Sequence, residues 1–124
     1  MLNSREIEKV RQQLETFLAE VRPSPTHRAI QDVSYTLSVD AFLVTEHLQC
    51  AESLRLVAHH RLKAVHSDDP QGWLIFAINS DGQWAPYPNC VFSATLDSVL
   101  ALARETLTPV TSAAASDNTS ANVA

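Results

Sequence analysis

The first part of the chain carries apolar residues at spacings of three and four, the repeat of a helix with one buried face. Asn3 and Glu6 stand at the positions of a capping box, in which each side chain accepts a hydrogen bond from the other residue's backbone. Pro23 and Pro25 end the helix, because proline lacks the backbone donor that a helix needs. We therefore predict a helix over residues 4–22, whose buried face comprises Ile7, Val10, Leu14, Phe17, Leu18 and Val21.

Three stretches then alternate between apolar and polar residues, which is typical of strands with one buried face. They cover residues 32–39, 41–48 and 54–66. The third is the longest, and His60 falls in phase with its apolar side, so we predict that His60 faces the core. The rest of that side comprises Leu54, Leu56, Ala58, Leu62, Ala64 and His66. The opposite side comprises Arg55, Val57, His59, Arg61, Lys63 and Val65.

A turn at residues 68–72 leads into residues 73–79, an almost continuous apolar run that indicates a strand covered on both faces. Asp81-Gly82 supplies the positive φ angles of a tight hairpin, so residues 83–87 return as a short strand. Pro86 and Pro88 cannot donate to a sheet, which makes this an edge strand.

The last periodic segment predicts a second helix, capped by Ser93 or Thr95 and ended by Pro109. Its apolar stripe comprises Leu96, Val99, Leu100, Ala103 and Leu107. The fold class is therefore α+β: an N-terminal helix, an antiparallel meander of four or five strands and a C-terminal helix. Both helices have one apolar stripe, so we expect them to cover one face of the sheet. We predict a single domain over residues 1–108 and a disordered tail over 109–124, where small polar residues have nothing to bury.

Composition narrows the class of protein. The chain has 124 residues, of which 45% are hydrophobic and 19% charged, as in a globular domain. It has no apolar run of membrane-spanning length and no secretory leader, so we expect a cytoplasmic protein. Cys50 and Cys90 are too few for a disulfide framework, and we expect both to be free thiols. The net charge of −5 disfavours a broad nucleic-acid surface and suits a protein partner.

One group of motifs resembles a known family. The motifs are the Arg22-Pro23-Ser24-Pro25 turn, Lys63-Ala64 on a strand, and a hairpin carrying Trp73, Asp81, Trp84 and Tyr87. In this succession the chain resembles a bacterial family of small proteins known as domain of unknown function three-zero-two-four. The resemblance implies this α+β fold over most of the chain and implies no activity.

The strongest candidate site is the basic side of the third strand. Arg55, His59, Arg61 and Lys63 share that side if the alternation is regular, with Trp84 nearby. Positive and aromatic side chains on an open sheet are how several folds bind single-stranded nucleic acid. A solvated sheet face explains the same pattern, and the acidic total charge favours that explanation.

Metal binding and catalysis find weaker support. His47 and Cys50 form one short pair, whereas zinc signatures repeat such pairs. Glu46 with Arg61 and Lys63 resembles a nuclease site only in part, because metal-dependent hydrolysis needs several carboxylates. The chain lacks nucleotide-binding and hydrolase motifs. We expect no cofactor, no metal and no enzymatic activity.

The tryptophan hairpin completes the candidate surface. Trp73 is expected in the core, whereas Trp84 and Tyr87 lie on the edge strand, where aromatic residues anchor partners. The sequence therefore predicts a non-catalytic protein-interaction module of inhibitor, immunity or adaptor type. A nucleic-acid-binding module using the basic strand is the first alternative, and a small metal-dependent hydrolase or nuclease is the second. An exposed edge strand can also pair two copies into a homodimer.

Overall fold

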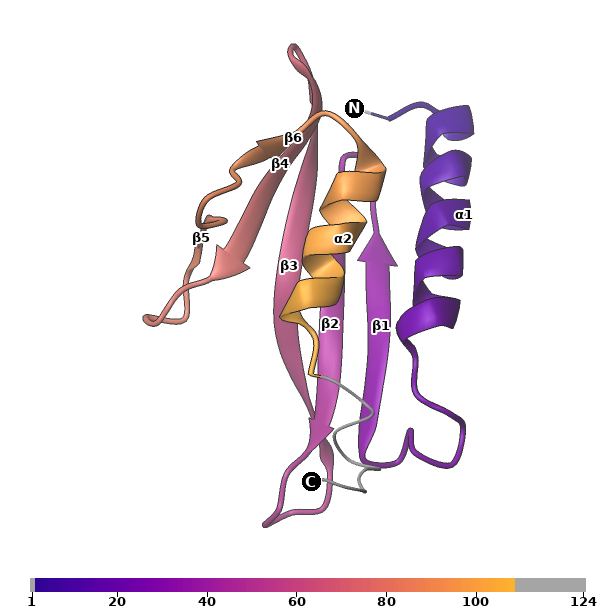
Figure 1. The fold of residues 1–124 in the computed structure, drawn as a ribbon, viewed down its shortest axis with the longest axis vertical. Coiled ribbons are helices and arrows are strands. Elements are labelled where there is room, and N and C mark those ends of the chain that lie inside the picture. Colours follow the sequence, from indigo (N-terminus) through magenta and orange to yellow (C-terminus); the bar gives the residue numbers. More distant parts are fainter. Residues whose placement is uncertain (1, 109–124) are drawn as a thin grey trace.

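A computed structural model describes residues 2–108, and the predicted tail at 109–124 lies outside this range. Two helices enclose the strands in the chain order, which confirms the predicted α+β class (Figure 1). The elements are α1 (Ser4–Val21), β1 (Gln31–Leu37), β2 (Ala41–Gln49), β3 (Leu56–Asp68), β4 (Gln71–Ile78), β5 (Trp84–Pro86), β6 (Phe92–Ser93) and α2 (Leu96–Thr106).

The strands form one antiparallel sheet in the order β1-β2-β3-β4-β5, which is the predicted meander. The proline-containing β5 ends this path, as an edge strand should. The two-residue strand β6 was not predicted, and it pairs with the start of β4.

Both helices begin where the sequence predicts. The Asn3 side chain accepts a hydrogen bond from the backbone N–H of Glu6 (2.8 Å), and Glu6 accepts one from the backbone N–H of Asn3 (2.9 Å). Thr95, rather than Ser93, is the cap of α2, and its hydroxyl accepts from the backbone N–H of Ser98 (3.3 Å). These bonds satisfy donors that a helix start otherwise leaves free.

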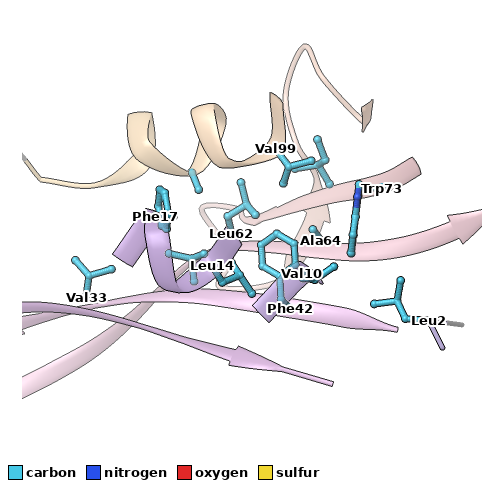
Figure 2. Close-up of a cluster of buried hydrophobic side chains, with 13 residues drawn as sticks. Leu2, Val10, Leu14, Phe17, Val33, Phe42, Leu62, Ala64, Trp73 and Val99 are labelled. Carbon is cyan, nitrogen blue, oxygen red and sulfur yellow. The ribbon is translucent and has the colours of Figure 1, made fainter. Parts of the chain in front are cut away.

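The core lies between the helices and one face of the sheet (Figure 2). Leu14 of α1 and Val99 of α2 are fully buried against Phe42, Leu62 and other sheet residues. Trp73 is also buried, as predicted, and packs edge-on against Phe42 with ring centroids 5.3 Å apart. The core comprises Leu2, Val10, Leu14, Phe17, Val33, Phe42, Val44, Leu62, Ala64, Trp73, Ile75, Val99 and Ala103.

A β-bulge breaks the alternation of β3. Val44 of β2 lies opposite Leu62, but the next residue, Thr45, lies opposite His60, so Arg61 is the extra residue. A bulge places two neighbouring residues against one and shifts the phase of those before it. The predicted apolar side of β3 is therefore right for Leu62 and Ala64 and wrong for the residues before Arg61, of which Leu56, Ala58 and His60 are all exposed.

Gly72 supports the packing of β6 on β4, because a Cβ atom there would lie 2.5 Å from the Phe92 ring and from the Ser93 carbonyl oxygen. Gly72, the last residue of the predicted turn at 68–72, therefore belongs to β4, and Phe92 and Ser93 pack closely against its backbone. Gly82 has a φ of 78° at the hairpin tip, and a Cβ there would meet nothing within 4 Å. Asp81 does not have the positive φ that the hairpin prediction gave to both residues.

Replacing Gly72 with alanine should destabilise the fold by about 2–3 kcal/mol, because the Ser93 backbone would have to move and because residues with a side chain rarely adopt its φ of 155°. Gly82→Ala should cost about 1 kcal/mol, from the positive φ alone. Urea unfolding of both variants measures the difference. Equal losses in the two variants would show that the approach of β6 is not the reason for glycine at position 72.

Candidate functional site

The face of the sheet opposite the helices is uncovered among residues 2–108. Cross-strand partners share a face, and the register links Leu43, Lys63 and Phe76 in one row across β2, β3 and β4. We call this surface the open face. Its members include Asp32, Ser34, Thr36, Leu43, Thr45, His47, Ala58, His60, Lys63, Val65, Leu74, Phe76, Ile78, Trp84 and Phe92.

Four of these residues gather into a group that we call the Trp84 cluster: His60, Lys63, Phe76 and Trp84. The Lys63 Nζ lies 5.0 Å from the ring centroid of Trp84 and 5.3 Å from that of Phe76. The His60 ring stacks on Trp84 with centroids 6.4 Å apart and an interplanar angle of 26°. A cation over aromatic faces is held by the ring quadrupoles, so the cluster presents charge and apolar area together.

The polar part of the open face lies across β1 and β2. The hydroxyl of Thr45 lies 3.0 Å from the Nδ1 of His60, and the hydroxyl of Ser34 lies 2.7 Å from the Nε2 of His47. These two contacts orient both imidazoles on the face. Hydroxyl and imidazole pairs of this kind satisfy each other without a charged partner.

The four predicted basic residues are not brought together. Arg55 precedes β3, His59 lies opposite Glu46 on the helix side, and Lys63 is on the open face. The extra residue Arg61 turns to the helix side, where its Nε and Nη2 each lie 2.9 Å from the Glu46 carboxylate. The prediction of one basic side is therefore wrong, because it assumed an unbroken alternation.

The predicted aromatic pair is divided as well. Trp84 faces Ile78 across the ladder and joins the open face. Tyr87 is half-buried against the core, and burial raises the pKa of its phenol, with the Glu105 carboxylate acting in the same direction. Of the two predicted partner-binding aromatics, Trp84 has the surface position.

The buried imidazole is His66, not the predicted His60. The His66 side chain is almost entirely buried, and its ring packs edge-on against Trp73 with centroids 5.1 Å apart. His60, by contrast, is exposed. Both residues are in phase with the apolar side by simple alternation, and only the bulge between them separates their environments.

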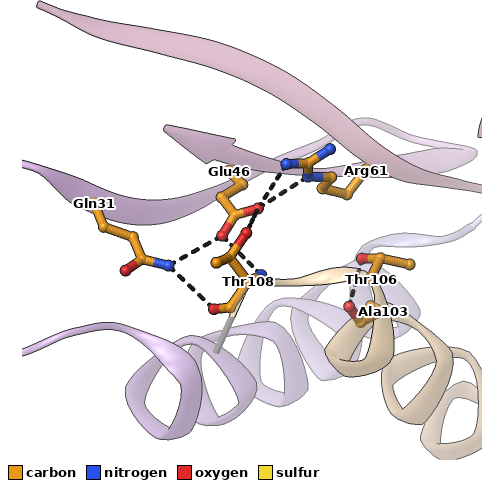
Figure 3. Close-up of polar contacts among 6 residues, drawn as sticks. All are labelled: Gln31, Glu46, Arg61, Ala103, Thr106 and Thr108. Atoms are coloured by element: carbon orange, nitrogen blue, oxygen red, sulfur yellow. Dashed lines mark hydrogen bonds and ion pairs between the residues drawn. The ribbon is translucent and has the colours of Figure 1, made fainter. Parts of the chain in front are cut away.

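Glu46 is a fully buried carboxylate surrounded by donors (Figure 3). Besides Arg61, it accepts hydrogen bonds from the Gln31 amide (3.2 Å) and from the backbone N–H of Thr108 (2.9 Å). The Thr108 hydroxyl lies 3.2 Å from the other carboxylate oxygen, and the Gln31 amide also donates to the Thr108 carbonyl (3.0 Å). Glu46 thereby joins β1, β2, β3 and the segment after α2.

The contacts of Glu46 bear on the nuclease-like site that Glu46, Arg61 and Lys63 suggested in the sequence. Glu46 and Arg61 do meet, but Lys63 is on the other face of the sheet, so the three do not form one site. Every carboxylate oxygen of Glu46 already accepts from the protein. The arrangement fits a structural carboxylate, and nothing in the sequence pattern pointed to Gln31 or Thr108 as its partners.

The other candidate ligands are dispersed. Cys50 and Cys90 are both free thiols. Backbone N–H groups of Ser53 and Glu52 lower the pKa of the Cys50 thiol, because they stabilise the thiolate. Within residues 2–108, no three His, Cys, Asp or Glu side chains lie close enough to hold a metal ion.

The fold and the open face define the class: an α+β protein with a one-layer antiparallel sheet covered by two helices on one face only. Residues 2–108 match the family model described as a domain of unknown function (DUF3024). The chain belongs to that family, which confirms the resemblance. Comparison with curated proteins and with solved structures found no match. Neither helix in the described part of the chain is long and apolar enough to cross a membrane.

Glu46→Gln should destabilise the protein by about 2–4 kcal/mol. The new amide NH2 would face Arg61, Gln31 and the Thr108 backbone, which are all donors, and the Arg61 charge would lose its partner. Glu8→Gln is the control, because Glu8 pairs with Arg11 on the exposed surface of α1, and it should change stability by less than about 0.5 kcal/mol. Urea unfolding measures both, and a near-neutral Glu46→Gln would refute the structural role.

Asp32 should contribute to the acid sensitivity of the fold. Arg22 donates to both carboxylate oxygens, at 2.7 and 2.9 Å, and this lowers the pKa of Asp32 with help from the Val33 backbone N–H. A carboxyl whose pKa is lower in the folded state stabilises at pH above its unfolded value, about 4, and loses that contribution as the pH falls through the folded pKa.

Asp32→Asn should therefore lower the urea midpoint near neutral pH. The difference in midpoint between this variant and the parent protein should become smaller below about pH 4. Asp81→Asn makes the same chemical change at the hairpin tip and should retain the parent's pH dependence. Midpoints measured from about pH 3 to pH 7 test both. A difference that is constant over this range would mean that the Arg22 contact adds nothing that depends on ionisation.

Proposed function

We propose that this protein is a non-catalytic module that acts by binding a partner protein. The observation that carries the proposal is the open face. Leu74 and Ile78 are 41% and 38% exposed there, beside the half-buried aromatic rings of the Trp84 cluster. A contiguous apolar and aromatic surface on a small domain marks an interaction site more often than it marks solvated surface. Such a module serves as inhibitor, immunity protein or adaptor according to what its partner does.

Nucleic acid fits the open face less well. Phosphate binding draws on several lysines and arginines at once, and Lys63 is the one lysine or arginine among the residues assigned to this face. Arg61 is engaged by Glu46 on the other side. Stacking on Trp84 next to Lys63 keeps single-stranded nucleic acid as the alternative to be tested.

Leu74→Glu should abolish capture of the partner, because a charge would be buried at the centre of an apolar contact. Val39→Glu is the matched control, since Val39 is 50% exposed in the turn between β1 and β2 and lies outside the strands that form the open face. Urea unfolding first establishes that both variants are folded. The two variants and the parent are then used as baits in lysate of the native host, and the bound protein is quantified.

The capture is run with and without nuclease, and the nucleic acid is quantified as well. A discrete protein that survives nuclease and is lost only with Leu74→Glu supports the proposal. Partners lost on nuclease treatment, or equal capture by Leu74→Glu and the parent, would overturn it. Co-purifying nucleic acid that falls with rising salt would make the alternative the leading function.

A further inference from the structure

A fork opens in the sheet where β4 leaves β3 (Figure 1). The last rung between the two strands joins Lys63 to Phe76, and β4 then pairs only with β5, through Ala77 and Ile78. β3 continues along β2 down to Leu56. The fork contains a groove of about 490 Å³, lined by His59, His60, Arg61, Ala77, Ile78 and Thr106.

The β3 side of the fork is an unpaired strand edge. Residues 56–62 pair with β2 on one side and, within residues 2–108, with no strand on the other. The hydrogen bonds found outside the regular elements of this range do not use their outward backbone groups either. Outward N–H and C=O groups in a row are a template for an added strand.

The bulge explains why this edge is free. Arg61 is the extra residue of β3, two residues before Lys63, and its side chain pairs with the buried Glu46. A bulge bends its strand and ends regular pairing beside it. The fork therefore opens next to a bulge whose extra residue pairs with the buried carboxylate of Glu46.

The fork is also free of acidic residues in an acidic protein. No Asp or Glu occurs in residues 55–67 or 70–80, although the chain has 14 of them and a net charge of −5. His59 and His60 are exposed residues of the free edge that face opposite sides of the sheet, and Lys63 lies at the apex of the fork on the same side as His60. Leu56 and Val57 add exposed apolar area along the same edge. This surface complements a chain of negative charge with apolar residues between the charges.

We infer that an extended, acidic segment of a partner protein adds to β3 as a strand in this fork. The inference rests on the proposed function and specifies how the partner is held: backbone hydrogen bonds to residues 56–62, and carboxylates near His60 and Lys63 on the open face. A nucleic acid would leave the unpaired backbone donors and acceptors of the edge without matching groups.

The probe is a synthetic peptide of about eight residues in which glutamate alternates with valine. It is titrated into the full chain labelled with 15N, up to about 1 mM, and amide shifts and amide exchange are followed. Saturable shifts and slowed exchange at residues 56–61 are the expected result. The same peptide with lysine in place of glutamate should bind about tenfold more weakly.

N-methylation of alternate peptide residues tests the strand geometry. One set of alternate amides points at β3 and the other away. Methylating one set should lower affinity about tenfold or more, and methylating the other should change it less than about twofold. Equal effects of the two sets would overturn strand addition.

Two variants of the protein test the charge. Lys63→Glu should lower the affinity for the acidic peptide about tenfold. Lys9→Glu, the same change on the exposed surface of α1, should leave the affinity for that peptide within about twofold of the parent value. A peptide that shifts the amide signals of Leu74 and Trp84 but not those of residues 56–61 would show that the fork is not the binding site.

The two proposals fail in different ways. If no peptide binds, yet a partner sensitive to Leu74→Glu is captured, the inference is overturned and the interaction module stands. A single-stranded DNA probe that binds in place of the peptides, and is lost with Lys63→Glu, overturns the inference. If no partner protein is captured either, the interaction module fails with it.

Discussion

The buried carboxylate of Glu46 is the constraint on which the rest of the structure depends. A fully buried charge is costly unless it is paired and every lone pair is used, and Glu46 meets that requirement with donors from three separate segments. Its charged partner, Arg61, is the extra residue of β3. Its bond to Thr108 fixes where the chain leaves α2, so one side chain sets both the course of a strand and the end of the fold.

The bulge at Arg61 divides the residues of β3 between two surfaces. On the helix side the Arg61 guanidinium pairs with Glu46, and on the other side Lys63 and His60 lie beside Trp84. β4 separates from β3 at the next rung and turns towards β5. The same local irregularity therefore shapes the open face and the fork, which is why a binding role draws on both.

Much of this architecture is predictable from residue patterns. The spacing of three and four in α1, the Asn3–Glu6 capping box and the Asp81-Gly82 hairpin are local signals, and the structure has each of them. The candidate site was less predictable. One extra residue reverses the face of every residue before it. Neither the bulge at Arg61 nor the contacts of Gln31 and Thr108 can be detected from the spacing of apolar residues in the sequence. The strand β6 was not predicted because two residues are too few to show the alternation of apolar and polar positions that identifies a strand.

Lys63 and Trp84 were foreseeable for a different reason. Lys63 lies after the bulge, where the alternation counted from the core residues Leu62 and Ala64 still holds. Trp84 follows a tight turn whose register is fixed by its length. Residues close to a strong local signal were placed correctly, and those separated from it by the irregularity, such as His59 and His60, were not.

An unpaired strand edge usually threatens a protein with self-association. The residues of this edge are poorly suited to pairing with the same edge of a second copy. Two copies joined antiparallel along residues 56–62 would set histidine against histidine at the centre of the contact, with a Lys63 at either end. In that pairing, Lys63 of one copy lies opposite Arg55 of the other at both ends of the contact. Like charges directly opposite each other disfavour the pairing of two copies along this edge.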